Sequence, residues 1–199
     1  MSLLIESIKI FNGCIYNLRR HENRMQRSRV ALISKDITPI PLRKYIEIPN
    51  DLRQGLVKCR IVYKEDVQEI TYTSYSPYII KSLKLVESNL IDYQYKYLDR
   101  NHIKELYAQR GNCDDIIMVK DRMLTDSSYG NIALLKDGVW YTPLTCLLNG
   151  TRRQQLIDQG KILEADISVV DIDKYEKICL FNAMIGLNKS TIRIPFIVK

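Results

Sequence analysis

Three short segments carry side chains whose types and order are suited to chemistry. Lys96 supplies a primary amine among aromatic and aliphatic neighbours, in the run Tyr95–Arg100. Asp126 supplies a carboxylate before a run of small residues, and Gly150 stands in a turn before an expected helix. An amine can attack a carbonyl carbon, and a carboxylate can hold a protonated ring nitrogen. A glycine turn at a helix N-terminus presents backbone N–H groups to a phosphate.

Pyridoxal phosphate is one ligand that needs all three groups. Its aldehyde requires a lysine amine that is unprotonated often enough to react. Its ring nitrogen requires a carboxylate that keeps it protonated, and its phosphate requires clustered N–H groups and a fixed cation. Taken singly, Lys96 is most simply a surface charge, Asp126 a turn cap and Gly150 a turn residue. The hypothesis therefore depends on their occurring together.

Arg24 can supply the fixed cation. A helix is expected over residues 18–34, and Arg24 lies at the flank of its apolar stripe, whereas Arg19 and Arg27 face outward. A buried arginine that pairs with a ligand suits that flank. The stripe itself consists of Leu18, His21, Met25, Ser28 and Leu32.

Composition excludes several other classes of protein. In 199 residues, no apolar run approaches the roughly 20 needed to cross a bilayer. The N-terminus lacks a basic segment followed by a long apolar core, so we expect no signal peptide and a cytoplasmic protein. The net charge of +7 is spread along the chain, and its one dense basic stretch, 18–29, has no interleaved aromatic residues. We therefore expect no nucleic-acid partner.

Cysteine and histidine content argues against a metal centre. The five cysteines are widely spaced without a Cys-x-x-Cys pair, and only two histidines are present. This pattern favours neither a disulfide framework nor a zinc site. We expect no bound metal.

The alternation of apolar and polar residues predicts an α+β protein with two small domains. We expect an N-terminal domain over 1–86, a linker over 87–95 and a larger C-terminal α/β domain over 96–199 that carries Lys96. Asn12-Gly13 and Asp137-Gly138 are expected hairpin turns. Helices are expected at 18–34, 102–109 and 150–160, with a helical turn at 173–177. Strands are expected at 5–10, 14–16, 55–63, 69–75, 78–86, 116–119, 122–125, 132–135, 139–141, 178–182 and 192–198, with a strand or connection at 166–171.

Several motifs in this order resemble those of the class IV aminotransferases, the fold-type IV pyridoxal-phosphate enzymes. Lys96-Tyr97-Leu98-Asp99-Arg100 is similar to the family's Lys-x-Leu-Asn-Arg, a form common among its lyases. Asp126–Asn131 is similar to Glu-x-x-x-x-Asn, and Leu148–Arg153 to the phosphate turn Leu-x-Gly-Ile-Thr-Arg. Upstream, Glu6–Lys9, Asn12-Gly13 and His21–Met25 are similar to Glu-Thr-Ile-Arg, Asn-Gly and His-x-x-Arg-Leu, and Phe181–Met184 fits a second phosphate turn.

The resemblance implies a D-amino-acid aminotransferase-like fold with the cofactor in the cleft between two domains of a homodimer. Lys96 would form the Schiff base and shuttle protons. Asp126 would pair with the ring nitrogen, and Leu148 would pack on the ring. The phosphate would be bound by the turn at Gly150, by Arg24, and by the backbone amides of Thr151, Arg152 and Met184.

Two departures from the family pattern bear on activity. Asp126 replaces the usual glutamate, which shortens the reach of the carboxylate by one methylene. The chain is also short before Lys96, where residues of other members wall the substrate pocket. Three functions for a small-molecule amino substrate therefore stay open: an aminodeoxychorismate lyase that forms 4-aminobenzoate and pyruvate, an aminotransferase for branched-chain or D-amino acids, and a cofactor-binding protein with little activity.

Overall fold

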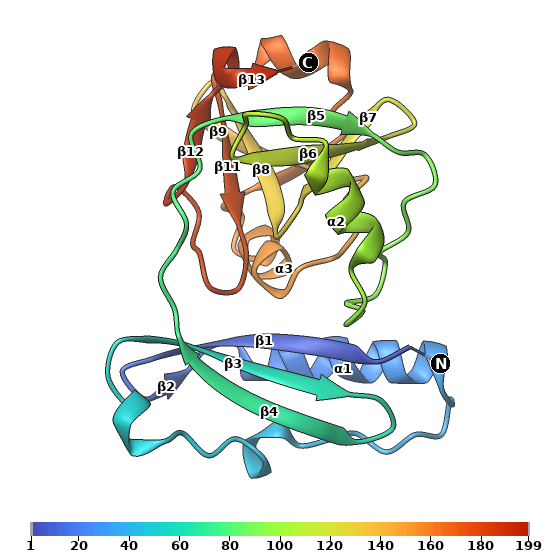
Figure 1. Ribbon diagram of the computed structural model, residues 1–199, viewed down its shortest axis with the longest axis vertical. Coiled ribbons are helices and arrows are strands. Elements are labelled where there is room, and N and C mark those ends of the chain that lie inside the picture. Colours follow the sequence, from blue (N-terminus) through green and yellow to red (C-terminus); the bar gives the residue numbers. More distant parts are fainter. Residues whose placement is uncertain (1, 199) are drawn as a thin grey trace. The chain divides into compact units, whose positions relative to one another are not determined.

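The chain folds into two compact units of mixed α and β structure. The computed structural model describes residues 2–198 (Figure 1). Unit 1 comprises the residues through Pro77 together with Tyr95–Asp99, and unit 2 comprises Tyr78–Gln94 and the residues from Arg100 onward.

These units differ from the predicted domains in two places. Residues 78–94 join unit 2 because the strand at Leu83–Glu87 pairs with strands of that unit. Lys96 joins unit 1, and not the C-terminal domain, because the segment around it bonds to the first strand: Ile5 N donates to Lys96 O over 2.9 Å, and Leu98 N donates to Leu3 O over 2.8 Å.

Unit 1 is an antiparallel sheet of four strands in the order β2-β1-β3-β4. The predicted hairpin is confirmed: β1 (Leu4–Phe11) pairs with β2 (Cys14–Ile15) around Asn12 and Gly13, which both have positive φ, as a tight hairpin turn requires. β3 (Leu56–Tyr63) and β4 (Val67–Ser74) pair antiparallel and confirm the strands predicted at 55–63 and 69–75.

The helix α1 (Leu18–Leu32) covers one face of this sheet (Figure 1). Met25 packs with Ile8 and Ile10 of β1 and with Cys59 and Ile61 of β3 in one core cluster. The predicted apolar stripe is therefore buried against the sheet, and Arg24 is buried at its flank with 7% of its surface exposed. Two short 3-10 helices, Leu42–Lys44 and Asn50–Leu52, complete the connection to β3.

Arg29 is a buried structural residue that helical periodicity did not single out. Its guanidinium donates to the carbonyls of Thr38 (2.7 Å), Lys64 (3.3 Å) and Glu65. Only 3% of its surface is exposed. These bonds hold the loop after α1 and the β3–β4 turn together, and they provide acceptors for the N–H groups of a buried guanidinium.

Unit 2 is built on strands in the order β10-β9-β8-β7-β6-β5-β13, and β11 pairs with β8 and with β12. The pairs β5–β6, β5–β13 and β9–β10 are parallel, and the remaining pairs are antiparallel. The strands are β5 (Leu83–Glu87), β6 (Asp115–Lys120), β7 (Met123–Ser127), β8 (Asn131–Lys136), β9 (Val139–Pro143), β10 (Leu163–Ala165), β11 (Lys177–Phe181), β12 (Thr191–Arg193) and β13 (Ile197–Val198).

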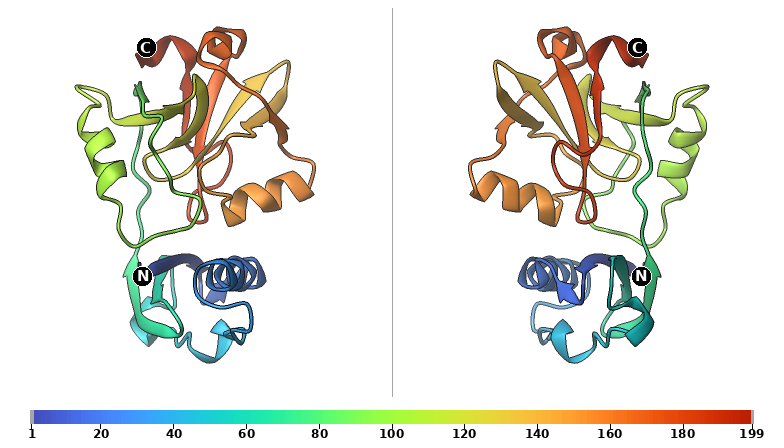
Figure 2. Two further views of the ribbon diagram at one scale, coloured as in Figure 1. Left: turned by 90° about the vertical axis from the view of Figure 1, so that its right-hand side faces the viewer. Right: turned by 90° about the vertical axis from the view of Figure 1, so that its left-hand side faces the viewer.

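Two core clusters lie on opposite faces of β8 and β11. Ile132 and Leu180 belong to one cluster, whereas Ala133 and Phe181 belong to the other. Because neighbouring strand residues point to opposite faces, both faces of these strands are buried. The helix α3 (Thr151–Asp158) packs Leu156 into the second cluster and is thereby fixed beside the β8 strand. Figure 2 shows α2 (Asn101–Ala108) and α3 on opposite sides of the unit.

The irregular stretches depart from the prediction. Residues 78–82 are not a strand, and the last predicted strand is interrupted by a 3-10 turn at Ile194–Phe196, because Pro195 cannot donate to a sheet ladder. The predicted strand or connection at 166–171 and helical turn at 173–177 are replaced largely by one 3-10 helix, Val169–Lys174. The cysteines are free, and Cys14 is exposed and not buried.

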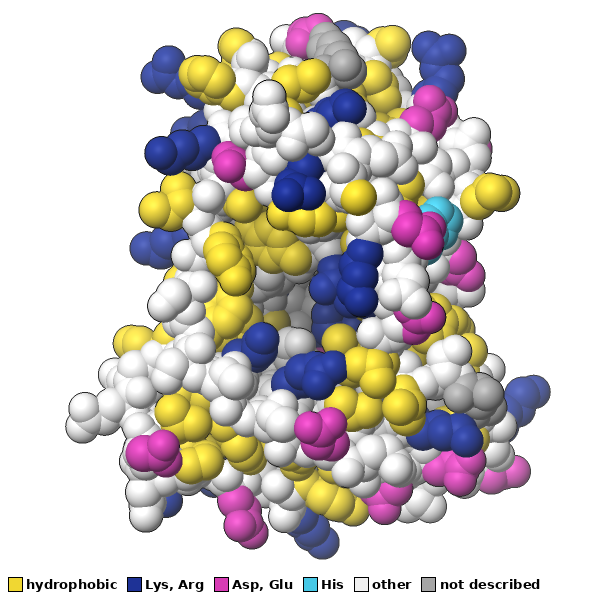
Figure 3. Space-filling model, in the orientation of Figure 1, with side chains coloured by type: hydrophobic (Ala, Val, Ile, Leu, Met, Phe, Trp, Pro, Cys, Tyr) yellow, Lys and Arg dark blue, Asp and Glu magenta, His cyan; other side chains and the backbone are white. Residues whose placement is uncertain are grey.

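The described surface is mixed in character. On the face drawn in Figure 3, basic side chains are interspersed with acidic and hydrophobic ones. No helix within residues 2–198 is long and apolar enough to span a membrane.

The bonds of Arg29 predict a large effect of its removal. Arg29→Leu is expected to lower the free energy of unfolding by about 2–3 kcal/mol, because it removes the three hydrogen bonds that join the loop after α1 to the β3–β4 turn. Arg27→Leu, on the exposed face of the same helix, should change it by no more than about 0.5 kcal/mol. Urea unfolding of both variants measures the difference. Equal effects would show that the Arg29 bonds are dispensable.

Candidate active site

The β7–β8 hairpin positions the predicted carboxylate. Asp126 ends the strand ladder opposite Asn131, and Ser127 N donates to Gly130 O over 2.9 Å to close the turn. Gly130 lies so close to the backbone of Phe181 that an added Cβ would stand 2.5 Å from its carbonyl oxygen. Glycine is therefore required for this hairpin to pack against β11.

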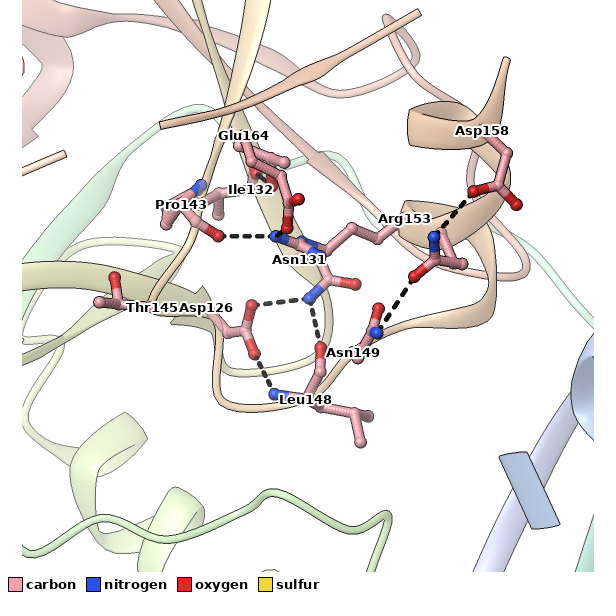
Figure 4. Close-up of polar contacts among 12 residues, drawn as sticks. Asp126, Asn131, Ile132, Pro143, Thr145, Leu148, Asn149, Arg153, Asp158 and Glu164 are labelled. Carbon is pink, nitrogen blue, oxygen red and sulfur yellow. Dashed lines mark hydrogen bonds and ion pairs between the residues drawn. The ribbon is translucent and has the colours of Figure 1, made fainter. Parts of the chain in front are cut away.

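Asn131 links that carboxylate to the turn before α3. Its Nδ2 donates to Asp126 Oδ1 and to Leu148 O, each over 2.8 Å (Figure 4). Leu148 N donates to the other carboxylate oxygen, Oδ2, over 2.9 Å. Both oxygens of Asp126 are thus fixed by bonds from two different segments, which orients the carboxylate.

Gly150 is required by the same network. Its φ of −65° is ordinary, so the constraint is space and not backbone conformation. A Cβ added at Gly150 would overlap Asn131 Oδ1. The glycine lets the turn approach Asn131 closely enough for the Leu148 bonds to form.

Burial makes the Asp126 carboxylate unusually basic. The side chain is 5% exposed, and its burial raises the pKa to about 6, although the bonds from Leu148 N and Asn131 partly oppose that rise. Asp126 forms none of the ion pairs found within residues 2–198. A buried carboxylate of this kind is stabilised in its charged form by any cation placed beside it.

The first turn of α3 is tied to the sheet by Arg153. Its Nη2 donates to Pro143 O at the end of β9 over 2.9 Å and to the Glu164 carboxylate in β10 over 2.6 Å (Figure 4). Arg153 is 2% exposed. The N–H groups of Thr151 and Arg152 lie in this fixed turn, where a helix provides no acceptor of its own and favours a bound anion.

The second predicted phosphate turn is held by Asn182. Asn182 Oδ1 accepts from Met184 N over 2.8 Å and from Ile185 N over 3.0 Å. The N–H of Met184 therefore donates within its own turn, and its role in phosphate binding stays a prediction. The turn does lie near α3, since a Cβ at Gly186 would be 3.8 Å from Arg152 Nη2.

In unit 1, Lys96 and Arg24 are anchored to adjacent residues of β1. Lys96 is half-buried, and its carbonyl accepts from Ile5 N. Arg24 forms two hydrogen bonds with the next residue, Glu6. Arg24 Nε donates to Glu6 Oε1 over 2.8 Å, and Arg24 Nη2 donates to Glu6 Oε2 over 2.5 Å. The side chain of Glu6 is fully buried.

His21 completes a buried polar cluster around Glu6. Its Nδ1 lies 2.7 Å from Glu6 Oε2. Burial by itself would raise the pKa of Glu6, but Arg24 and His21 lower it to about 2. Burial also lowers the pKa of His21, so its imidazole is neutral near pH 7. Glu6 thus stays ionised at physiological pH and fixes the Arg24 guanidinium.

The structure brings together most of the predicted residues within each unit. Asp126 and Leu148 are bonded in unit 2, and Gly150 begins the helix that contains Thr151 and Arg152. Sequence analysis gave no role to Asn131, Arg153 or Glu6. The spacing of Asp126 and Asn131 could have predicted the role of Asn131. A carboxylate and an amide at the two ends of a short hairpin face each other and can form a hydrogen bond.

The donor set fits pyridoxal phosphate. A buried carboxylate without an ion pair suits a protonated ring nitrogen, and a fixed helix N-terminus suits a phosphate. Lys96 supplies the amine. Within residues 2–198, no three histidine, cysteine or acidic side chains are grouped as metal ligands.

Comparison with known proteins gives a family match over nearly the whole chain. Residues 3–189 match the family model described as amino-transferase class IV. An uncharacterized protein of Haemophilus influenzae is 39% identical over 185 residues, which cover 92% of this chain and 98% of that protein. A structure from Haemophilus somnus, of a protein proposed to be a 4-amino-4-deoxychorismate lyase, has a TM-score of 0.88 and 34% identity, covering 94% of this chain and 98% of its own.

A D-alanine aminotransferase of Listeria innocua is also similar. It is 25% identical over 152 residues, which cover 73% of this chain. They cover 46% of that enzyme, so this chain matches about half its length.

The close packing of Gly150 on Asn131 predicts coupled effects on stability. Gly150→Ala is expected to lower the free energy of unfolding by about 2 kcal/mol, because the added methyl displaces the Asn131 amide. In an Asn131→Ala background the same change should cost much less. Gly186→Ala is the control, since its Cβ would have only ordinary contacts. Urea unfolding measures the effect of Gly150→Ala in the wild type and in Asn131→Ala. An equal decrease in the free energy of unfolding in both proteins would refute this coupling.

Asp126 predicts a specific dependence of stability on pH. In the folded protein the pKa of Asp126 is about 6, above its ordinary value of 3.8. The protonated carboxyl group therefore stabilises the fold fully below pH 3.8, and this stabilisation is lost as the pH rises through 6. Between pH 4 and 7.5, cofactor-free protein should lose about 3 kcal/mol through this group. Asp126→Asn should lack that loss. If the difference in the free energy of unfolding between wild type and Asp126→Asn does not change with pH, the prediction is wrong.

Proposed function

Because this chain belongs to the class IV aminotransferase family, we propose that it is a pyridoxal-phosphate-dependent lyase that converts 4-amino-4-deoxychorismate into 4-aminobenzoate and pyruvate. The resemblance read from its motifs is confirmed by the family match, and members of the family are pyridoxal-phosphate enzymes. As the resemblance implies, we propose a cytoplasmic homodimer.

One observation carries the choice of a lyase over an aminotransferase. The protein from Haemophilus somnus that is proposed to be such a lyase matches this chain over nearly all of both lengths. The D-alanine aminotransferases match over less than half of their own length. The Lys96–Arg100 motif, in the form common among the lyases, supports the same choice.

Asp126 and Leu148 would hold the cofactor ring. When bound, pyridoxal phosphate supplies an electron-withdrawing ring that stabilises negative charge at the carbon bearing the substrate amine. Asp126 would keep the ring nitrogen protonated, and the raised pKa of this carboxylate would fall once the cation stands beside it. Leu148 would pack on the ring, close to the carboxylate that its own N–H orients.

The phosphate would be held by the first turn of α3 after Gly150, through the N–H groups of Thr151 and Arg152, and by Arg24. Glu6 fixes the guanidinium of Arg24 through Nε and Nη2 and would hold it in place for this contact. The backbone amide of Met184 would also contribute, from the turn that Asn182 holds beside Arg152.

Lys96 would carry out the proton transfers. Its Nζ would hold the cofactor between turnovers and, once released by the substrate amine, would take the proton from the ring carbon that bears this amine. Loss of that proton and cleavage of the ether bond to the enolpyruvyl group make the substrate ring aromatic. The departing group takes up a proton and leaves as pyruvate, so the two products contain all atoms of the substrate.

The lyase proposal predicts pyruvate release that depends on Lys96. Cofactor-loaded wild type given 4-amino-4-deoxychorismate should release pyruvate and 4-aminobenzoate in equal amounts. Lys96→Ala should lower the rate by at least about a thousandfold, because it removes both attachment and proton transfer. Lys104→Ala, an exposed lysine in α2, is the control and should be unaffected. Absence of pyruvate from the wild type would rule the lyase out.

An aminotransferase acting on D-amino or branched-chain acids is the second candidate, favoured by the similarity to D-alanine aminotransferase. In that case, D-alanine or a branched-chain amino acid should change the visible absorbance of the cofactor, and a 2-oxo acid should reverse the change. If neither reaction occurs although the cofactor binds, the chain is a pyridoxal-phosphate-binding protein with little activity.

A further inference from the structure

We propose that Arg100 is a positioning residue for the Asp126 carboxylate. Arg100 holds the tip of the β7–β8 hairpin and thereby fixes Asp126 in the orientation that binds the ring nitrogen of the cofactor. The inference rests on the proposed function, since it concerns the same carboxylate and the same ring. All residues that carry it belong to unit 2.

The β7–β8 hairpin has little support from its own ladder. One residue pair, Asp126 and Asn131, joins β7 to β8 within the described chain. On the other side of β7, the register with β6 shifts between Ile117 and Val119. A two-stranded ribbon with so few ladder bonds is not stable by itself. The orientation of the hairpin therefore depends on contacts from other segments.

Two side chains from distant segments hold the tip of the hairpin, residues 127–130. Asn182 Nδ2 donates to Tyr129 O over 3.3 Å, and Arg100 Nη2 donates to Ser128 O. Arg100 stands immediately before α2, which packs against β6. The guanidinium is therefore held by the body of unit 2, and through its bond the hairpin tip is held as well.

The surroundings of Arg100 make this bond a strong one. Arg100 is half-buried, and its Nε is buried without a hydrogen-bond partner among residues 2–198. Asp115, at the start of β6, is 1% exposed, and burial raises its pKa, although Ser128 and the charge of Arg100 partly oppose that rise. The tip thus lies beside a cation away from bulk water, where a charged donor bonds a carbonyl more strongly than a neutral donor does.

The position of the tip matters for the carboxylate because the bonds to Asp126 have fixed directions. Its two oxygens accept from Asn131 Nδ2 over 2.8 Å and from Leu148 N over 2.9 Å. A ring nitrogen can bond only to the lone pairs that these donors leave free. Asn131 follows the tip directly, so a shift of the tip turns the carboxylate and these lone pairs. Arg100 therefore acts on ring binding through the hairpin.

Two forms of the cofactor test the inference without relying on turnover. Cofactor-free protein is titrated calorimetrically with pyridoxal phosphate and with its 1-deaza analogue, in which a C–H group replaces the ring nitrogen. Wild type should bind pyridoxal phosphate roughly tenfold more tightly than the analogue, and Asp126→Ala should remove this preference. Arg100→Gln should remove most of it. Arg110→Gln is the matched control and should keep it, because Arg110 is also half-buried in unit 2 and donates to a backbone carbonyl, that of Tyr107.

A second pair of variants separates positioning from the loss of a buried charge. Arg100→Gln leaves the Asp115 carboxylate without its neighbouring cation, which can lower stability by itself. Asp115→Asn alone should keep the preference for pyridoxal phosphate. Arg100→Gln combined with Asp115→Asn should lose most of it, although no buried carboxylate is then left without a cation at this position.

The outcomes separate the inference from the reaction. If Arg100→Gln weakens the binding of both ligands by the same factor, or of neither, Arg100 is only a structural residue and the inference is overturned. Absence of the preference from wild type would overturn it together with the ring-nitrogen role of Asp126, even if pyruvate is released. A preference that requires both Asp126 and Arg100 supports the inference even if no pyruvate forms, and the proposed reaction alone would then fail.

Discussion

The contact between Asn131 and the turn at Leu148–Gly150 is the constraint on which the candidate site of unit 2 depends. One amide group bonds the buried carboxylate of Asp126 and the carbonyl of Leu148 at the same time. Gly150 is the residue that allows this approach. Because α3 begins at the same turn, the position of its N-terminus is coupled to the orientation of the carboxylate. The proposed cofactor would thereby find its charge partner and its phosphate-binding turn in a single local network.

The two buried carboxylates of the site are in opposite electrostatic states. Glu6 is surrounded by Arg24 and His21 and has a pKa of about 2, so its charge is fully compensated within unit 1. Asp126 accepts hydrogen bonds from Asn131 and Leu148 but forms no ion pair within residues 2–198, and burial raises its pKa to about 6. Glu6 therefore fixes a neighbouring cation, whereas Asp126 gains stability from a cation that a ligand brings. This difference is the reason that we propose Asp126, and not Glu6, as the carboxylate that binds the cofactor.

Much of the fold followed from local sequence patterns. The turns Asn12-Gly13 and Asp137-Gly138 correctly predicted two hairpins. The apolar stripe of α1 correctly predicted that Arg24 is buried at its flank. The unit to which Lys96 belongs was not predictable, because its backbone bonds join it to a strand some ninety residues earlier in the chain, and no local pattern encodes such pairing. The roles of Arg29, Arg153 and Glu6 were missed for the same reason: their partners are distant in sequence. The residues expected to contact the cofactor stay predictions.

The central claim is that Lys96 holds the cofactor, and its most direct measurement is chemical trapping. Borohydride reduction of the cofactor-loaded protein, followed by proteolysis and mass spectrometry, identifies the lysine to which the cofactor is bound. The account predicts one modified peptide carrying the cofactor on Lys96 and none in Lys96→Ala. Modification of a different single lysine, or the same labelling pattern in Lys96→Ala, would contradict it.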